Sequence, residues 1–265
     1  MKALQRLAAV AALCTALLSG AGVADAPDKV LFVGNSFSFY NNGIHNHYNS
    51  LIRANGDWQR GKNRTRLKTL SGGHIHEHVS GLAAYLKEDK RGWDAVVLQG
   101  HSNEPVLSSK KARFEAALAE AVDIVRQQDM QPILFMTWGY KGNGQMATDI
   151  ANAYLAQGKK LEVPVVPVGL AFAAAAKQFP HVDLYVPDVL GVEQQGDTPA
   201  LTYRRDLKHP SAAGTYLAAC VFYASLQGKS PEGNLFTAGL SPDVAQALQA
   251  LSWELVSKFA QQEGN

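Results

Sequence analysis

The chain has few residues that could crosslink it, and its charges nearly balance. It contains only 2 cysteines among 265 residues, and Cys14 lies in an apolar N-terminal stretch. Beyond that stretch only Cys220 remains, so no intramolecular disulfide can form there. The formal net charge of +2 is too small to indicate binding to nucleic acid or a membrane surface. Stability must therefore come from a hydrophobic core, to which Cys220 belongs as a buried thiol.

Long apolar runs are also missing, except at the N-terminus. Basic residues precede an apolar stretch over residues 7–18, and small residues follow as far as Ala26. This layout is typical of a secretory signal peptide, and the stretch is too short for a comfortable membrane span. We predict a signal peptide over residues 1–26, cleaved after Ala24 or Ala26, and a single domain over residues 27–265. The expected location is secreted or periplasmic, with an uncleaved anchor as the alternative.

Strand and helix patterns alternate along the rest of the chain. Five apolar or β-branched segments predict strands, at residues 30–33, 64–70, 95–98, 132–136 and 163–168. Helices are expected over residues 43–54, 75–87, 108–128, 145–161, 170–179, 211–227 and from 241 onward. This alternation indicates an α/β protein whose parallel sheet is covered on both faces. Residues 180–205 are predicted to be irregular.

Polar segments follow three of these strands, at the sheet edge where α/β proteins bind ligands. Ser36 follows the first strand on a Gly-Asn turn, Gly72 follows the second, and Asn103 follows the third. Farther along, Asp206 precedes His209 by three residues. Because the carboxyl ends of parallel strands meet at one edge, we expect these segments to lie close together.

Together these residues could carry out acyl transfer. A serine hydroxyl becomes a good nucleophile when a base takes its proton, so Ser36 is the candidate nucleophile and His209 the candidate base. Asp206 would orient the imidazole and stabilise its charged form. The backbone N–H groups of Ser36 and Gly72 and the side-chain amide of Asn103 are candidate oxyanion donors. Each segment alone fits an ordinary turn, loop or cap, but their joint order after strands favours catalysis.

The segments around Ser36, Gly72, Asn103 and His209 resemble the conserved blocks of the SGNH, or GDSL-type, hydrolases. Residues 99–103, Gln-Gly-His-Ser-Asn, look especially like the Gln-Gly-Glu-Ser-Asn signature of carbohydrate O-acetylesterases in that superfamily. The resemblance implies a flavodoxin-like three-layer α/β/α sandwich with a central, mostly parallel five-stranded sheet.

The resemblance also implies an activity. It implies hydrolysis of carboxylic esters through an acyl-enzyme, on small-molecule or glycan esters and commonly on O-acetyl groups, with no metal or organic cofactor. Two positions depart from the pattern. Asn35 replaces the usual aspartate before the nucleophile, and His101 replaces the glutamate of the acetylesterase signature.

Three other functions stay open at this point. An acyltransferase could use the same acyl-enzyme, and a glycan-binding domain could keep the pocket without turnover. A metallohydrolase could be built from alternating histidines: His45, His47, His74, His76 and His78. His45, His47, His74 and His101 could instead line the rim of the site and contact substrate hydroxyls.

Overall fold

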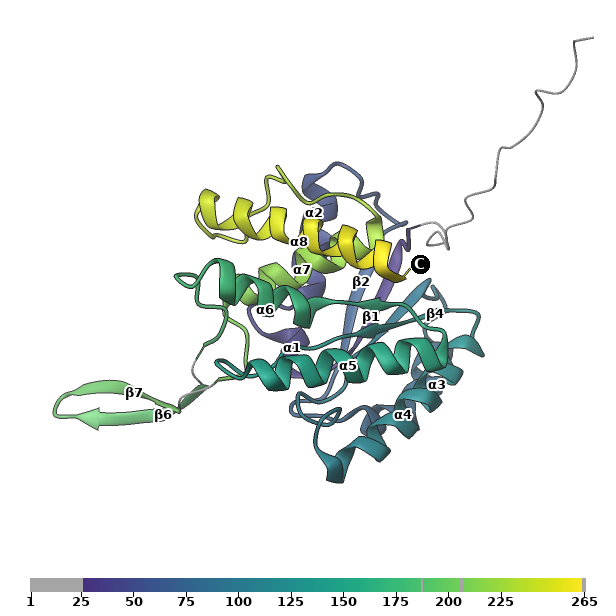
Figure 1. The fold of residues 1–265 in the computed structure, drawn as a ribbon, viewed down its shortest axis with the longest axis horizontal. Helices are drawn as coiled ribbons and strands as arrows, with labels where there is room; N and C mark the ends of the chain where they lie inside the picture. The colour runs from purple at the N-terminus through teal and green to yellow at the C-terminus, as the bar shows by residue number, and fades with distance from the viewer. Residues whose placement is uncertain (1–25, 187, 205–206, 264–265) are drawn as a thin grey trace, which may run out of the picture.

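The computed structural model describes residues 26–186, 188–204 and 207–263. It shows a central sheet between two layers of helices (Figure 1). The predicted signal peptide lies outside the described residues except for Ala26, and so does Asp206.

Five parallel strands form the sheet in the order β2-β1-β3-β4-β5. They are β1 (Lys29–Gly34), β2 (Arg64–Thr69), β3 (Ala95–Leu98), β4 (Gln131–Phe135) and β5 (Val165–Val166). This is the flavodoxin-like order, in which the chain reverses direction across the sheet between β1 and β3. The predicted three-layer α/β fold is therefore confirmed, although β5 is shorter than the predicted strand.

Eight helices are described. They are α1 (Ser36–Phe39), α2 (Ile44–Ala54), α3 (Ile75–Glu88), α4 (Ser108–Arg126), α5 (Gly144–Leu161), α6 (Val168–Gln178), α7 (Ala212–Gln227) and α8 (Pro242–Glu263). One face of the sheet is covered by α3, α4 and α5, and the other by α2, α6, α7 and α8 (Figure 1). Within the described part of the chain, no helix has the length and apolar character needed to cross a membrane.

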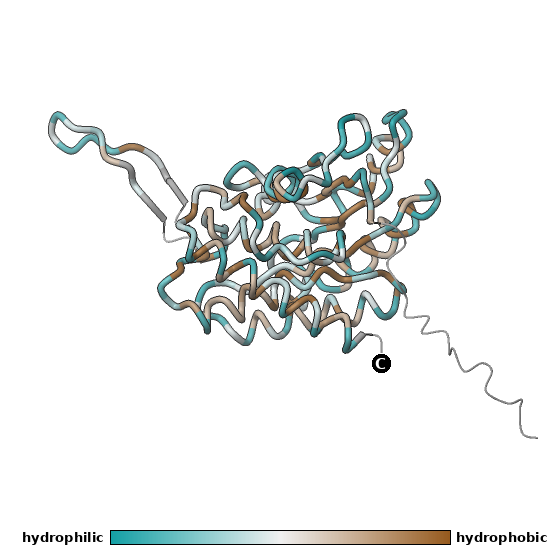
Figure 2. Tube along the Cα trace, turned by 90° about the horizontal axis from the view of Figure 1, so that it is seen from above, coloured by the Kyte–Doolittle hydropathy of each residue, from teal (hydrophilic) through white to brown (hydrophobic). Residues whose placement is uncertain are grey.

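The alternation of side chains along β1 divides the core in two. Val30 and Phe32 point into the cluster beneath α2 and α7, whereas Leu31 and Val33 point into the cluster beneath α3 and α4. All four are fully buried, and hydrophobic residues run through the centre of the molecule (Figure 2). Burial of each such side chain stabilises the fold by roughly 1.5–3 kcal/mol. Both faces thus hold β1 firmly, and β1 leads directly into Ser36.

The prediction that residues 180–205 are irregular was wrong. Strands β6 (Asp188–Gln195) and β7 (Thr198–Arg204) pair antiparallel and extend away from the body (Figure 1). Gln195 pairs with Thr198, so only Gly196 and Asp197 make the turn, and Gly196 has φ +62°. Gly-Asp is a signal for a two-residue hairpin. Val192 of β6 is 63% exposed, so the alternation of buried and exposed residues that predicts a strand is weak here.

Candidate active site

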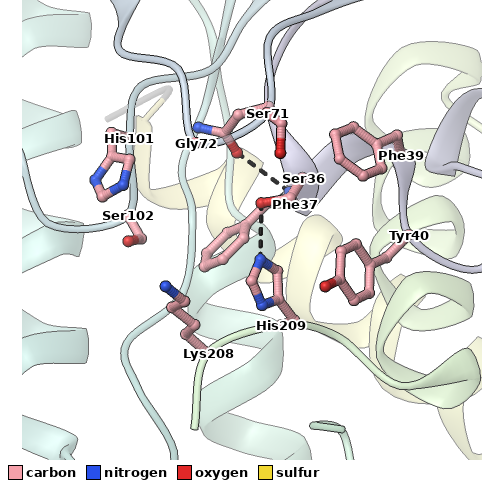
Figure 3. Close-up of a pocket in the computed structure, with 11 residues that line it drawn as sticks. Ser36, Phe37, Phe39, Tyr40, Ser71, Gly72, His101, Ser102, Lys208 and His209 are labelled. Carbon is pink, nitrogen blue, oxygen red and sulfur yellow. Dashed lines mark hydrogen bonds between the residues drawn. The ribbon is translucent and has the colours of Figure 1, made fainter. Parts of the chain in front are cut away.

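Ser36 and His209 meet at the carboxyl edge of the sheet, although they are far apart in the sequence. Ser36 is the first residue of α1, a one-turn helix that begins just after β1. Its Oγ lies 2.8 Å from Nε2 of His209 (Figure 3). Each residue is only 8% exposed, so a substrate that reaches them meets a largely desolvated pair. This is the hydrogen-bonding distance that a serine nucleophile and its base require.

Four consecutive carbonyl groups anchor the segment that carries His209. Each one accepts a hydrogen bond from a different part of the chain. The donors are the N–H of Lys141 to Leu207 (2.6 Å), the indole N–H of Trp138 to Lys208 (2.8 Å), the N–H of Val186 to His209 (3.1 Å) and the side-chain amide of Asn41 to Pro210 (2.8 Å). The backbone at the imidazole is therefore fixed before substrate binds, which is what preorganised catalysis needs.

Aromatic rings hold the imidazole itself. The ring of Tyr40 stacks on one face of His209, and Phe37 meets it edge-on with centroids 5.9 Å apart. Phe37 in turn stacks on Trp138, which stacks on Phe172. Trp138 is fully buried, so it belongs to the packing beneath the site.

Asn35 and Gln99 form a buried polar network beneath Ser36. The Asn35 oxygen accepts from the N–H of Phe37 (3.1 Å) and the Gln99 side chain (2.6 Å). The Asn35 amide donates to the carbonyls of Gly73 (2.9 Å) and Gly100 (3.4 Å). Asn35 thus ties together the loops that follow β1, β2 and β3. A carboxylate could not make the last two bonds, which gives a physical reason for asparagine at this position.

Two glycines make the geometry of these loops possible. A Cβ on Gly34 would lie 2.3 Å from Oε1 of Gln99, so a side chain here would displace the network. Gly72 has φ +65° at the third position of a turn closed by the N–H of Gly73 and the carbonyl of Leu70 (3.0 Å). That conformation favours glycine.

The proposed oxyanion donors differ in their placement. Within the part of the chain that the structure describes, the backbone N–H groups of Ser36 and Gly72 donate to no acceptor, and both residues line the pocket. Asn103 is not among the lining residues. Its side-chain oxygen accepts from Nζ of Lys110 (3.1 Å) and lies 2.9 Å from Nδ1 of His101. The residue before it, Ser102, does line the pocket, a role that the sequence did not reveal.

The pocket above Ser36 has a volume of about 290 Å³. His101 and Ser102 line one side of it, and Phe39 and Tyr40 line the other (Figure 3). Among the described residues that line it there is no carboxylate. Its wall offers hydroxyl, imidazole and aromatic groups to a small polar ligand.

The five histidines considered for a metal site are divided between two helices. His45 and His47 lie on α2 and do not line the pocket. Burial lowers the pKa of His45 to about 4, with a further contribution from the charge of His47. His78, on α3, donates from Nε2 to the carbonyl of Gly34 (2.9 Å), and burial lowers its pKa as well. Burial also lowers the pKa of His47, so the surroundings of all three histidines disfavour the protonated form.

His74 and His76 lie at the start of α3, beside Glu104. The sequence showed no carboxylate at a recognised spacing from them, because Glu104 approaches from the loop after β3. His74 also stacks on His101, with ring centroids 4.4 Å apart. Burial, followed by the charge of His74, lowers the pKa of His101. The surroundings of His101 therefore disfavour its protonated form where it lines the pocket.

No protein-family model and no curated protein matches the sequence. Solved structures do match. A DUF4886 family protein from Bacteroides uniformis superposes with a TM-score of 0.63 at 19% identity, over 88% of this chain and 95% of that chain. The acetyl-xylooligosaccharide esterase Axe2 from Geobacillus stearothermophilus superposes with a TM-score of 0.57 at 17% sequence identity. The match covers 79% of this chain and 98% of that chain. A protein from Slackia heliotrinireducens, provisionally described as an SGNH hydrolase, superposes with a TM-score of 0.54 at 21% sequence identity. The match covers 73% of this chain and 96% of that chain.

At these identities the similarity establishes the fold. The chain has the three-layer α/β fold of the SGNH hydrolases, as its sequence motifs predicted. Its Ser36–His209 pair lies at the sheet edge where such folds bind ligands.

Proposed function

We propose that this protein is a serine esterase that hydrolyses carboxylic esters through an acyl-enzyme on Ser36. The observation that carries the proposal is the 2.8 Å separation between Oγ of Ser36 and Nε2 of His209, inside a pocket at the sheet edge. The anchored loop and the stacked rings around His209 support the same role, because a general base must be held in one orientation.

The reaction would run in two steps. His209 takes the Ser36 proton as Oγ attacks the ester carbonyl carbon; the ester C–O bond then breaks, and His209 returns the proton to the leaving alcohol. Water, deprotonated by His209, then attacks the acyl carbon; the bond between that carbon and Oγ breaks, the acid leaves, and His209 returns the proton to Oγ of Ser36. Asp206 is the proposed partner of His209.

Negative charge that develops on the carbonyl oxygen would be stabilised by N–H groups. The backbone donors of Ser36 and Gly72 are proposed for this role, and each donor of this kind is worth roughly 3–4 kcal/mol. Asn103 is proposed as a third donor, which requires its side chain to turn from Lys110 toward the pocket.

The proposed substrates are O-acetyl groups on carbohydrate. The superposable esterase Axe2 is described as acting on acetylated xylooligosaccharide. The pocket of about 290 Å³ suits a short acyl group, and its polar wall suits sugar hydroxyls. Cleavage of the predicted signal peptide would place the enzyme outside the cytoplasm, in a secreted or periplasmic location.

The test uses residues 27–265, a fluorophosphonate probe and short-chain esters. We expect the probe to add to Ser36, as located by mass spectrometry. Ser36→Ala should abolish labelling, and Ser36→Ala and His209→Ala should each lower kcat by a factor of about 10⁴ or more. Ser71→Ala is the control, because Ser71 is an exposed serine at the same pocket. Ester turnover in Ser36→Ala equal to that of the wild type would contradict the proposal.

A further inference from the structure

Three side chains of types that can bind a metal ion lie together beside the pocket, and the proposed ester hydrolysis uses none of them. One ligand atom from each of His74, His76 and Glu104 lies within 4.8 Å of the other two. We infer that these residues form a binding site for a divalent transition metal such as Zn²⁺. The inference does not depend on the esterase proposal.

Glu104 is fixed in the orientation that such a site needs. It is 2% exposed, and its Oε1 accepts from the backbone N–H groups of His101 (2.8 Å) and Ile75 (3.3 Å). These bonds direct the other oxygen, Oε2, toward His74, whose Nδ1 lies 2.5 Å away. Metal ligands are usually oriented by hydrogen bonds of this kind from the surrounding backbone.

The start of α3 places the two histidines. His74 immediately precedes the helix, and its backbone N–H donates to the side chain of Glu77 (2.6 Å). His76 lies in the first turn, with its ring centroid 5.5 Å from that of His74. Both rings are half-buried, so an ion can reach them from solvent.

Charge favours a cation at this position. A helix N-terminus carries partial positive charge, which opposes a cation. Two carboxyl groups lie beside the histidines. Oε2 of Glu104 is 2.5 Å from Nδ1 of His74, and Oε2 of Glu77 accepts from the His74 backbone N–H (2.6 Å). A carboxylate that binds a metal ion carries a full negative charge, which exceeds the roughly half charge of the helix end.

The donor set indicates the kind of metal. Two imidazoles and one carboxylate, with an open position for water, form a common zinc site. Tetrahedral zinc holds its ligand atoms about 3.4 Å apart. Nδ1 of His74 and Oε2 of Glu104, which now lie 2.5 Å apart, must therefore separate by roughly 0.9 Å, and the His76 nitrogen, which lies within 4.8 Å of a ligand atom on each of these residues, must come to about 3.4 Å from both. His76 can supply this movement by rotating its side chain, because it is half-buried and lies on a first turn.

The test is calorimetric titration of the untagged mature chain with zinc sulfate at pH 7.5, with Co²⁺ absorption as an independent report on coordination. We expect one ion per chain. His76→Gln should weaken binding at least ~10-fold and change the Co²⁺ spectrum. His181→Gln, at an exposed histidine outside the cluster, is the matched control and should bind as the wild type does.

Protons compete with the metal for imidazole nitrogen, so binding should also weaken at pH 5.5. His74→Gln provides a second ligand variant if His76→Gln does not fold. Wild-type affinity in either folded variant, or no measurable binding by the wild type, would overturn the inference.

Discussion

The phenol ring of Tyr40 lies flat against the imidazole of His209, with centroids 4.3 Å apart and planes inclined by 3°. The ring of Phe37 contacts the imidazole edge-on, with an angle of 75° between the two ring planes. In the proposed reaction the imidazole becomes a cation when it takes the Ser36 proton. Aromatic faces attract cations by about 0.5–2 kcal/mol, depending on desolvation. Tyr40 therefore both orients the proposed base and stabilises its charged form.

Replacing the Tyr40 ring should slow the chemical step. We expect Tyr40→Leu to lower kcat by about 2–30-fold, the factor that corresponds to 0.5–2 kcal/mol. Tyr40→Phe keeps an aromatic face and should retain more activity than Tyr40→Leu. Steady-state kinetics on a short-chain ester measure both, and thermal unfolding checks that the variants are folded. Equal kcat for Tyr40→Leu and the wild type would show that the stacked ring has no part in catalysis.

Asn103 offers a test of the third proposed oxyanion donor. A preorganised donor is worth about 10²–10³ in kcat, but the contact with Lys110 must break first, at a cost of about 1 kcal/mol. We therefore expect Asn103→Ala to lower kcat by only about 10–10²-fold. Lys110→Met removes one of the two contacts of the amide oxygen and leaves the contact with Nδ1 of His101, and it should not lower kcat. An unchanged kcat in Asn103→Ala would leave the backbone donors of Ser36 and Gly72 as the whole oxyanion hole.

Asn35 should matter for stability more than for chemistry. Asn35→Asp would put a carboxylate against the carbonyl oxygens of Gly73 and Gly100, to which the amide now donates. A buried pair of acceptors without donors costs about 1–3 kcal/mol, so the free energy of unfolding should fall by about that amount. Urea unfolding at pH 7.5 measures it. Equal stability of the two proteins would mean that the network accommodates aspartate.

Local pattern was enough to predict most of the fold. β3 and residues 30–33 of β1 are short, apolar and buried on both faces, so neighbouring residues in the sequence are enough to predict them. The structure brings Ser36 and His209 together, and both positions were visible in the sequence as a serine after a strand and a histidine before a helix.

Long-range contacts explain what was missed. α1 is a single turn whose N-terminal cap is Asn35, and four residues show no periodicity. Glu104 meets His74 from a loop 30 positions away, a separation that no spacing rule covers. The orientation of Asn103 depends on Lys110, one turn into α4, which sequence position alone does not reveal.

Buried histidines should make stability depend on pH. Burial lowers the pKa of His45 from 6.5 to about 4, so between these values the unfolded chain binds a proton that the folded chain does not. The contribution is therefore complete above pH 6.5 and is lost as pH falls toward 4. The full shift corresponds to roughly 3 kcal/mol, and because His45 is only half-buried we expect about 1 kcal/mol. Unfolding at pH 7.5 and 4.5 should show a smaller loss in His45→Gln than in the wild type, whereas His181→Gln should match the wild type. Identical losses in His45→Gln and the wild type would mean that His45 binds its proton equally well in the folded and unfolded chains.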